Sequence, residues 1–124
     1  MNSQEENNWR LLRNPNKGKY NFLIGVFNWS IELQEHEFNS LYNLLNKLIT
    51  EMFLIQNQLM EEELINLEIE NLPWYVELEG SKNNWSLRII FESFENTRSF
   101  EMYWPPQIAE QLFLEMRKMW ESMQ

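Results

Sequence analysis

Residues 74–91, WYVELEGSKNNWSLRIIF, alternate between apolar and polar side chains on both sides of a short polar stretch. The apolar members of this alternation are Trp74, Val76, Leu78, Trp85, Leu87 and Ile89. Because successive side chains of a strand point to opposite faces, the pattern predicts two strands that share one buried face. The stretch GSKNN at 80–84 has the composition of a turn. We therefore expect an antiparallel hairpin whose apolar face covers a hydrophobic core.

The same alternation predicts further strands on both sides of this hairpin. Alternating residues at 65–70 and 100–104 extend the same sheet. Near the N-terminus, runs at 9–13, 22–27 and 29–33 predict a second group of strands. The middle run, FLIGVF, is apolar on both faces, which is typical of a central strand or of a strand at an interface.

Two segments, 35–59 and 106–121, carry apolar residues at three- and four-residue spacing and are predicted to be helices. The element order is therefore βββ–α–ββββ–α. This order predicts an α+β fold of two antiparallel sheets with a helix packed on each. Residues 1–8 are polar after Met1 and predict a disordered N-terminal tail. Residues 9–124 have the length of a single domain with its own core.

The composition excludes several classes of site. Among 124 residues, 19 are acidic and 10 are basic, so the formal net charge is −9. All the acids are Glu, there is no Cys, and His36 is the single histidine. Thiol nucleophiles, disulfides, Cys/His zinc sites and a Ser-His-Asp triad are thereby excluded. The three glycines form neither GxGxxG nor a Walker loop.

We expect no enzyme, and so no catalytic residue, no metal site and no cofactor. Three consecutive helical residues such as Glu61-Glu62-Glu63 do not converge on one ion. Glu77 and Glu79 share a strand face but have no evident partner for acid–base work, and they are expected to be solvated. His36 lies in a polar helix start and is expected to be exposed with no role.

The charged residues are predicted to separate by surface. If the apolar side of the hairpin is buried, six glutamates lie on the opposite face, with Arg88 among them. These glutamates are Glu68, Glu70, Glu77, Glu79, Glu92 and Glu101. Such a face repels a phosphate backbone. Four of the ten bases, Arg10, Arg13, Lys17 and Lys19, instead lie in and after the first strand, and we expect any polyanion to bind at this corner.

Six tryptophans suggest a possible stacking platform for single-stranded nucleic acid or sugar. Four of them lie at strand ends on the faces assigned to the core, which favours aromatic packing instead. These four are Trp29, Trp74, Trp85 and Trp104. Trp9, next to Arg10, is the tryptophan that we expect to be exposed.

Several short motifs follow one another along the chain. They are WRL at 9–11 followed by Asn14-Pro15, WSIEL at 29–33, MEEE at 60–63, WYVELEG at 74–80, WSLR at 85–88 and WPP at 104–106. Together they resemble a family of cyanobacteria and plastid-bearing eukaryotes, the domain-of-unknown-function family 1818. The resemblance covers nearly the whole chain. The chain departs from the family's pattern at Leu12, where a glycine is expected, and in the turn at 94–98, which has no glycine.

The resemblance implies a fold and no catalytic residue. The family is similar to the single-stranded-DNA-binding transcriptional regulators of the Whirly type, and it has also been likened to cystatin-like folds. Fold does not settle function. Binding of the Whirly type needs a basic, aromatic sheet surface, whereas the second sheet of this chain is predicted to be acidic.

We expect a non-enzymatic interaction or regulatory protein that binds a protein partner or a second copy of itself. The strand at 22–27 and the methionines of the last helix, Met116, Met119 and Met123, provide apolar surface for such a contact. The alternative is a single-stranded nucleic-acid-binding transcriptional regulator. Its site would consist of Trp9, Arg10, Arg13, Lys17 and Lys19. A small-ligand pocket, as in some cystatin-like folds, also stays open.

The sequence contains no apolar run long enough to span a bilayer. The N-terminus is polar and acidic, unlike a signal peptide or a transit peptide. The absence of cysteine is compatible with a reducing compartment. We therefore expect a cytoplasmic protein that does not bind membranes.

Overall fold

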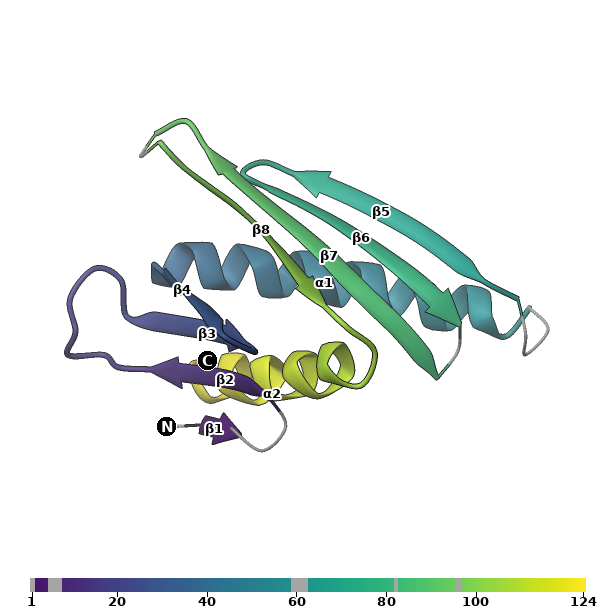
Figure 1. The fold of residues 1–124 in the computed structure, drawn as a ribbon, viewed down its shortest axis with the longest axis horizontal. Helices are drawn as coiled ribbons and strands as arrows, with labels where there is room; N and C mark the ends of the chain where they lie inside the picture. The colour runs from purple at the N-terminus through teal and green to yellow at the C-terminus, as the bar shows by residue number, and fades with distance from the viewer. Residues whose placement is uncertain (1, 5–7, 59–62, 82, 96) are drawn as a thin grey trace. The chain divides into compact units, whose positions relative to one another are not determined.

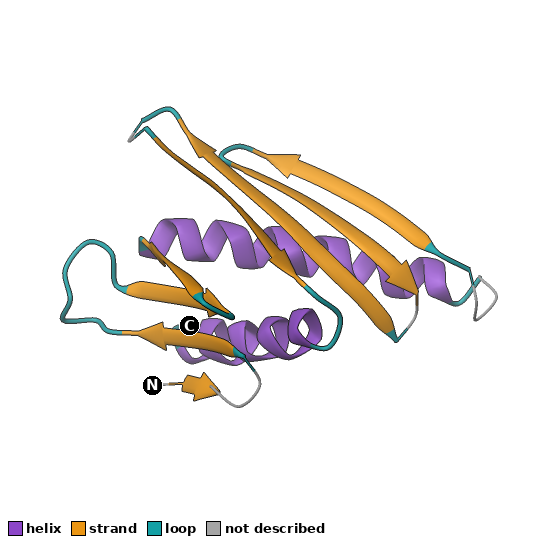
Figure 2. Ribbon diagram, in the orientation of Figure 1, coloured by secondary structure: helices purple, strands orange, loops and turns teal. Residues whose placement is uncertain are grey.

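The strands and helices follow the predicted order, βββ–α–ββββ–α, with one additional short strand at the start (Figure 1). The computed structural model describes residues 2–4, 8–58, 63–81, 83–95 and 97–124. The elements are β1 (Asn2–Gln4), β2 (Trp9–Arg13), β3 (Phe22–Val26), β4 (Trp29–Leu33), α1 (Glu35–Gln56), β5 (Ile65–Asn71), β6 (Trp74–Ser81), β7 (Asn84–Ser93), β8 (Arg98–Trp104) and α2 (Ile108–Ser122). The α+β class with two antiparallel sheets is confirmed (Figure 2).

The chain divides into two compact units. The first unit comprises residues 1–42 and 110–124, and the second unit comprises residues 43–109. The boundary between them falls inside α1, so the first turns of this helix belong to the first unit and its remainder to the second. No helix in the described part of the chain is both long and apolar enough to cross a membrane.

The short strand β1 lies within the segment predicted to be a disordered tail. Asn2–Gln4 pair antiparallel with β2, so that Asn2 is opposite Leu11 and Gln4 is opposite Trp9. Ladder hydrogen bonds are made by backbone groups, so a polar segment without hydrophobic alternation can form them. Residues 1 and 5–7 of the predicted tail lie outside the described residues.

In the first unit, the strands form an antiparallel sheet of order β1-β2-β3-β4. β3 therefore lies between two neighbours, which confirms the interpretation of its two apolar faces as those of a central strand. Ile24 is opposite Leu11 on one side and opposite Ile31 on the other. Phe22 stacks on Phe38 of α1, with ring centroids 4.4 Å apart. The buried face of this sheet thus continues onto the first turn of α1.

The start of α1 is capped by one of its own side chains. The backbone N–H of Gln34 donates a hydrogen bond of 2.9 Å to Oε1 of Glu37. This is one half of a capping box, in which the third residue of a helix reaches back to the residue before the helix. Later in the first unit, Tyr42 stacks on Phe113 and Trp120, with centroid distances of 5.9 and 5.0 Å. These rings join α1 to α2 within this unit.

In the second unit, the strands form an antiparallel sheet of order β5-β6-β7-β8. Val76 is opposite Ile69 on one side and Ile89 on the other. The six residues predicted to face the core are all 4% exposed or less: Trp74, Val76, Leu78, Trp85, Leu87 and Ile89. Phe91 stacks on Phe100 at 4.8 Å and meets Trp74 edge-on at 4.7 Å. The predicted inner face of this hairpin is therefore confirmed.

Candidate functional site

Trp9 is buried, and the expectation that it is exposed is wrong. Its side chain is 2% exposed, and its indole N–H donates a hydrogen bond of 3.1 Å to Oε1 of Gln111. Trp9 and Arg10 are consecutive in β2, so their side chains point to opposite faces of the sheet. Trp9 therefore shares the buried face of Leu11 and offers no ring for a base to stack on. Of the other tryptophans assigned to the core, Trp29 is half-buried, and the remaining ones are buried.

Arg10 lies across the opposite face of the same sheet. Its Nη2 donates a hydrogen bond of 2.7 Å to the backbone carbonyl of Trp29, which lies two strands away. On its way it passes over Gly25, where an added Cβ would collide with the guanidinium group. A side chain at position 25 would force the Arg10 guanidinium to move, so glycine is the residue that leaves room for it. Arg10 therefore has an internal structural partner.

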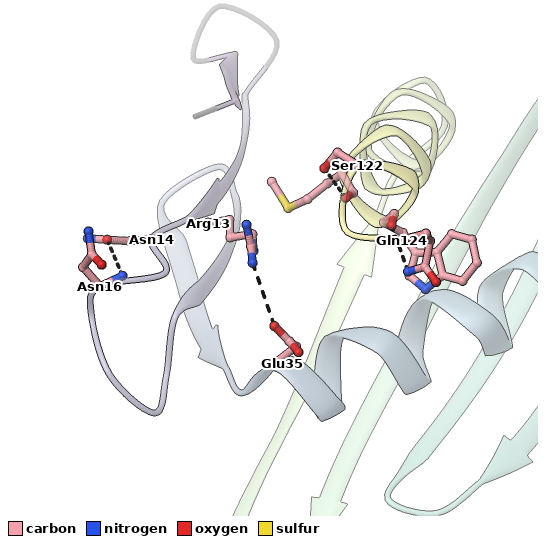
Figure 3. Close-up of polar contacts among 8 residues, drawn as sticks. Arg13, Asn14, Asn16, Glu35, Ser122 and Gln124 are labelled. Atoms are coloured by element: carbon pink, nitrogen blue, oxygen red, sulfur yellow. Dashed lines mark hydrogen bonds and ion pairs between the residues drawn. The ribbon is translucent and has the colours of Figure 1, made fainter.

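The remaining predicted bases lie beside acidic or aromatic side chains. Nη2 of Arg13 is 4.0 Å from Oε1 of Glu35 (Figure 3), and the Arg13 guanidinium is 5.8 Å from the centroid of the Phe22 ring. Nζ of Lys17 forms an ion pair with the Glu32 carboxylate.

Nζ of Lys19 lies 5.7 Å from the ring centroid of Tyr20, and both Lys17 and Lys19 are exposed. The structure does not bring the four basic side chains together on one face, since Arg10 and Arg13 are three residues apart in β2 and point to opposite sides of the sheet. It also supplies carboxylates that offset part of their charge.

The outer face of the β5–β8 sheet carries the predicted acidic residues. We call it the acidic face and define it by Glu68, Glu70, Tyr75, Glu77, Glu79, Arg88, Ile90, Glu92, Glu101 and Tyr103. Its six glutamates are exposed or half-buried, as predicted. The basic residues of the four strands are Arg88 and Arg98. The Arg98 guanidinium lies 5.1 Å from the centroid of the buried Phe91 ring, on the inner side of the sheet. Among the described residues, Arg88 is therefore the base of the acidic face.

Two of the six carboxylates are held by neighbours on the acidic face. The phenol of Tyr75 donates a hydrogen bond of 2.6 Å to Oε2 of Glu68. This bond raises the pKa of Tyr75 to about 12, because loss of the phenolic proton would place two negative charges side by side. Arg88 contacts both carboxylate oxygens of Glu101, at 3.2 and 3.3 Å, and these bonds raise the pKa of Arg88 above its ordinary value.

A hollow of about 490 Å³ lies at one end of the acidic face. Its apolar lining includes Leu72, Pro73, Tyr75, Ile90 and Phe94, and its carboxylates are Glu70 and Glu92. Leu72 is 67% exposed and Phe94 is 80% exposed, which is unusual for large apolar side chains that lie next to each other in a hollow. Within the described part of the chain, the side-chain carboxylates of Glu70 and Glu92 form no ion pair or hydrogen bond. The hollow therefore joins exposed apolar surface to two carboxylates, and its lining also includes Arg88, which is bonded to Glu101.

The alternation of residues along the strands does not predict this hollow. Leu72 follows β5 and Phe94 follows β7, in turns whose residues have no strand alternation. The hydrogen bond of 2.8 Å from the Glu92 N–H to the Pro73 carbonyl brings the two turn regions together. An apolar residue within a polar turn is the signal that could have indicated Leu72 and Phe94.

The arrangement is suited to binding by contact and charge. No three acidic, histidine or cysteine side chains among the described residues are grouped closely enough to hold a metal ion. Glu61 and Glu62 lie outside the described residues, and only Glu63 of that predicted run can be described. His36 is exposed, and its Nε2 lies 3.2 Å from Oε1 of Gln34.

A second hollow, of about 440 Å³, lies in the first unit beside α2. Trp9, Gln111, Leu114 and Lys118 contribute to its lining, together with other α2 side chains. Lys118 there pairs with Glu115 at 3.1 Å, so part of the charge of this hollow is already compensated. Both hollows are open to solvent, and neither has the enclosed shape of a buried ligand cavity.

Comparisons with known proteins show relatives over almost the whole length. The family model described as "Domain of unknown function (DUF1818)" matches residues 4–119. A crystal structure of a protein with unknown function from the DUF155 family, from Prochlorococcus sp. NATL2A, is similar to this chain. The two are 34% identical with a TM-score of 0.86, over 94% of this chain and 96% of that one. No curated protein matches the sequence.

Proposed function

The chain belongs to the family "Domain of unknown function (DUF1818)", and from this premise we propose that it is a non-enzymatic interaction protein that binds a basic segment of a protein partner on its acidic face. The observation that carries the proposal is the hollow in which Glu70 and Glu92, without partners among the described residues, lie beside the exposed Leu72 and Phe94. Apolar contact supplies affinity at such a surface, and charge supplies selection and a faster encounter.

The charge pattern supports a basic partner. The register places Glu68, Glu77 and Arg88 in one row across the sheet, and Glu70, Tyr75, Ile90 and Glu101 in the next. Because Arg88 is engaged by Glu101, it compensates little of the charge of the remaining glutamates. Arg88 also contributes to the lining of the hollow, but its guanidinium is bonded to Glu101, so a lysine or arginine of the partner would pair with Glu70 and Glu92.

The aromatic residues of the acidic face also support protein binding. Tyr103 is 54% exposed, and Tyr75 is half-buried with its hydroxyl on Glu68. Tyrosine is enriched at protein interfaces because its ring is rigid and apolar while its hydroxyl forms hydrogen bonds. These rings would pack against the aliphatic stems of lysine or arginine.

The test is a titration of the protein with a fluorescent peptide of alternating arginine and valine. We expect binding that weakens as salt increases. The double variant Glu70→Lys/Glu92→Lys should weaken binding about tenfold or more, because it reverses both charges at the hollow. The matched control, Glu51→Lys/Glu110→Lys, changes net charge by the same amount at exposed positions away from the acidic face. Equal weakening by both double variants would contradict the proposal.

A single-stranded nucleic-acid-binding regulator remains the second candidate, as the resemblance to Whirly-type folds implies. The observation in its favour is the exposure of Lys17 and Lys19, which follow Arg10 and Arg13 closely in the sequence. The pairing of Arg13 and Lys17 with carboxylates and the burial of Trp9 favour it less. Salt-dependent binding of a mixed-sequence single-stranded oligonucleotide that is lost in Lys17→Glu/Lys19→Glu would promote this candidate.

We also propose that the protein acts in the cytoplasm. The similarity to a Prochlorococcus protein is compatible with a cyanobacterial origin.

A second copy of the chain is an alternative to a foreign partner. Sedimentation over a range of concentrations tests self-association: a mass that rises with concentration supports a homodimer, and a constant monomer mass contradicts it.

A further inference from the structure

We propose that the basic segment of the partner binds as an additional strand on the free edge of β5, with basic side chains alternating with apolar ones. This inference rests on the proposed function, since it specifies the conformation and the sequence pattern of the segment that the acidic face attracts. The partner would extend the sheet and present its basic side chains on the same side as the glutamates.

β5 is paired on one side only. The strand order β5-β6-β7-β8 places it at the edge of its sheet (Figure 1), and its seven residues pair with β6 from Ile65 opposite Gly80 to Asn71 opposite Trp74. Among the described residues, no segment other than β6 forms backbone hydrogen bonds with it. An edge of this kind offers unpaired N–H and carbonyl groups to an extended peptide.

Apart from the charges of Glu68 and Glu70, which a basic segment would neutralise, the sequence of β5, INLEIEN, lacks the features that usually protect an edge. It contains no lysine, proline or glycine, and its register with β6 is continuous, without a bulge. Seven residues form a long enough ladder for a peptide of similar length. The edge is therefore regular and open to pairing.

Two other edge strands, β8 and β4, are less suitable for pairing with an added strand. On β8, the inward side chains Met102 and Trp104 are already buried, at 1% and 0% exposure, so Phe100 is the half-buried apolar side chain that an added strand would cover there. β4 has only five residues, and the carbonyl of Trp29 already accepts the hydrogen bond of Arg10. These differences favour β5.

The side chains of β5 specify the pattern of the partner. Leu67 and Ile69 are half-buried, although the residues opposite them, Leu78 and Val76, are completely buried. An apolar side chain on an added strand would complete this cover. On the other side, Glu68 and Glu70 are exposed and would face lysine or arginine, since opposite charges on adjacent strands attract.

A second copy of the chain fits this edge poorly. If two β5 strands paired antiparallel about their centre, Glu68 of one copy would lie directly opposite Glu68 of the other, and Glu70 would lie opposite Asn66. Like charges on directly opposite residues destabilise a strand pair. A basic segment of another protein is therefore the occupant that the charges select.

Three synthetic peptides test the inference on the full chain. The first is the plain arginine–valine peptide. The second carries methyl groups on its odd-numbered backbone nitrogens, and the third carries them on its even-numbered ones, so the two differ in parity. An added strand donates to β5 from every second residue, so methylation of one parity should weaken binding about tenfold or more, and methylation of the other should have little effect. Slower hydrogen exchange of β5 amides in the complex is also expected. Leu67→Lys should weaken binding, because it places an inward-pointing charge on the edge.

The outcomes separate the inference from the proposed function. If the plain peptide and both methylated peptides bind equally, and Glu70→Lys/Glu92→Lys still weakens them, strand addition is overturned and the proposed function is supported. If the plain peptide does not bind even at low salt, both are overturned. Parity-dependent binding with protection of β5 amides supports both.

Discussion

The side chain of Arg10 occupies the space where Gly25 would carry a Cβ, and from there it reaches the carbonyl of Trp29 at 2.7 Å. Arg10, Gly25 and Ser30 are opposite one another on β2, β3 and β4. One long side chain therefore spans the central strand and bonds to the edge strand. The arrangement depends on the absence of a side chain at position 25.

We expect Gly25→Ala to destabilise the protein by about 0.5–1.5 kcal/mol, the net value of the hydrogen bond that Arg10 would lose when displaced. In an Arg10→Ala background, the same change should be neutral or stabilising, because alanine suits a strand better than glycine. Urea unfolding of the two single variants and the double variant forms the thermodynamic cycle. Additive costs would show that Arg10 and Gly25 are not coupled.

Tyr75 should ionise at unusually high pH. Its pKa of about 12 in the folded protein exceeds the ordinary value of 10.0 because its hydroxyl donates to Glu68. The stabilisation from this pair is complete below pH 10 and is lost as pH rises toward 12, where the folded state must give up the phenolic proton. The difference in tyrosinate absorbance between wild type and Tyr75→Phe isolates this titration. Glu68→Gln should move it toward pH 10, and an unchanged midpoint would contradict the assignment.

Phe27 has a left-handed backbone conformation, with φ of 55°, in the turn between β3 and β4. Asparagine adopts this conformation more easily than phenylalanine does. Because Phe27 is 48% exposed, we expect Phe27→Asn to stabilise the protein by up to about 1 kcal/mol. Phe53, which is 53% exposed within α1, is the matched control, and Phe53→Asn should be destabilising. Thermal unfolding distinguishes the two; destabilisation by both would contradict the role of the backbone conformation.

Trp9 should contribute to stability and not to ligand stacking. Its ring is 2% exposed, so Trp9→Ala should cost about 3–5 kcal/mol, the range for loss of a large buried side chain. The half-buried Trp29 serves as a comparison, and its substitution by alanine should cost less. Denaturant unfolding followed by circular dichroism provides both values. A Trp9→Ala protein of unchanged stability would argue that the ring is exposed in solution.

Arg88→Gln should strengthen binding of the basic peptide. The substitution removes the base of the acidic face and frees the Glu101 carboxylate from its two hydrogen bonds. We expect an increase in affinity of a fewfold that is largest at low salt, as for a surface charge that acts through its field. Arg117→Gln on α2 changes net charge equally and should have a smaller effect. Weaker binding in Arg88→Gln would indicate that the peptide contacts Arg88 directly.

Local alternation predicted the strands and their faces correctly. Trp74, Val76 and Leu78 are buried, while Glu77 and Arg88 face away from the core, because the period of two within a strand is a local property. The two apolar faces of residues 22–27 indicated a central strand or a strand at an interface, and the structure places β3 inside its sheet. It failed for Trp9, because the polar neighbour Arg10 was interpreted as a sign of exposure although consecutive residues lie on opposite faces.

The amino-acid sequence alone specified the order of elements, the class of fold and which side of each strand is apolar, since all three follow from short-range periodicity. Tertiary structure determined which residues meet. Leu72 and Phe94, from turns more than twenty residues apart, both line the hollow. Arg13 lies near Glu35 only once the first sheet has formed. Such contacts depend on strand register and on the path of the turns, which involve backbone groups that every residue shares. The binding surface is therefore a product of pairing between distant segments, and the periodic pattern of any one segment does not contain it.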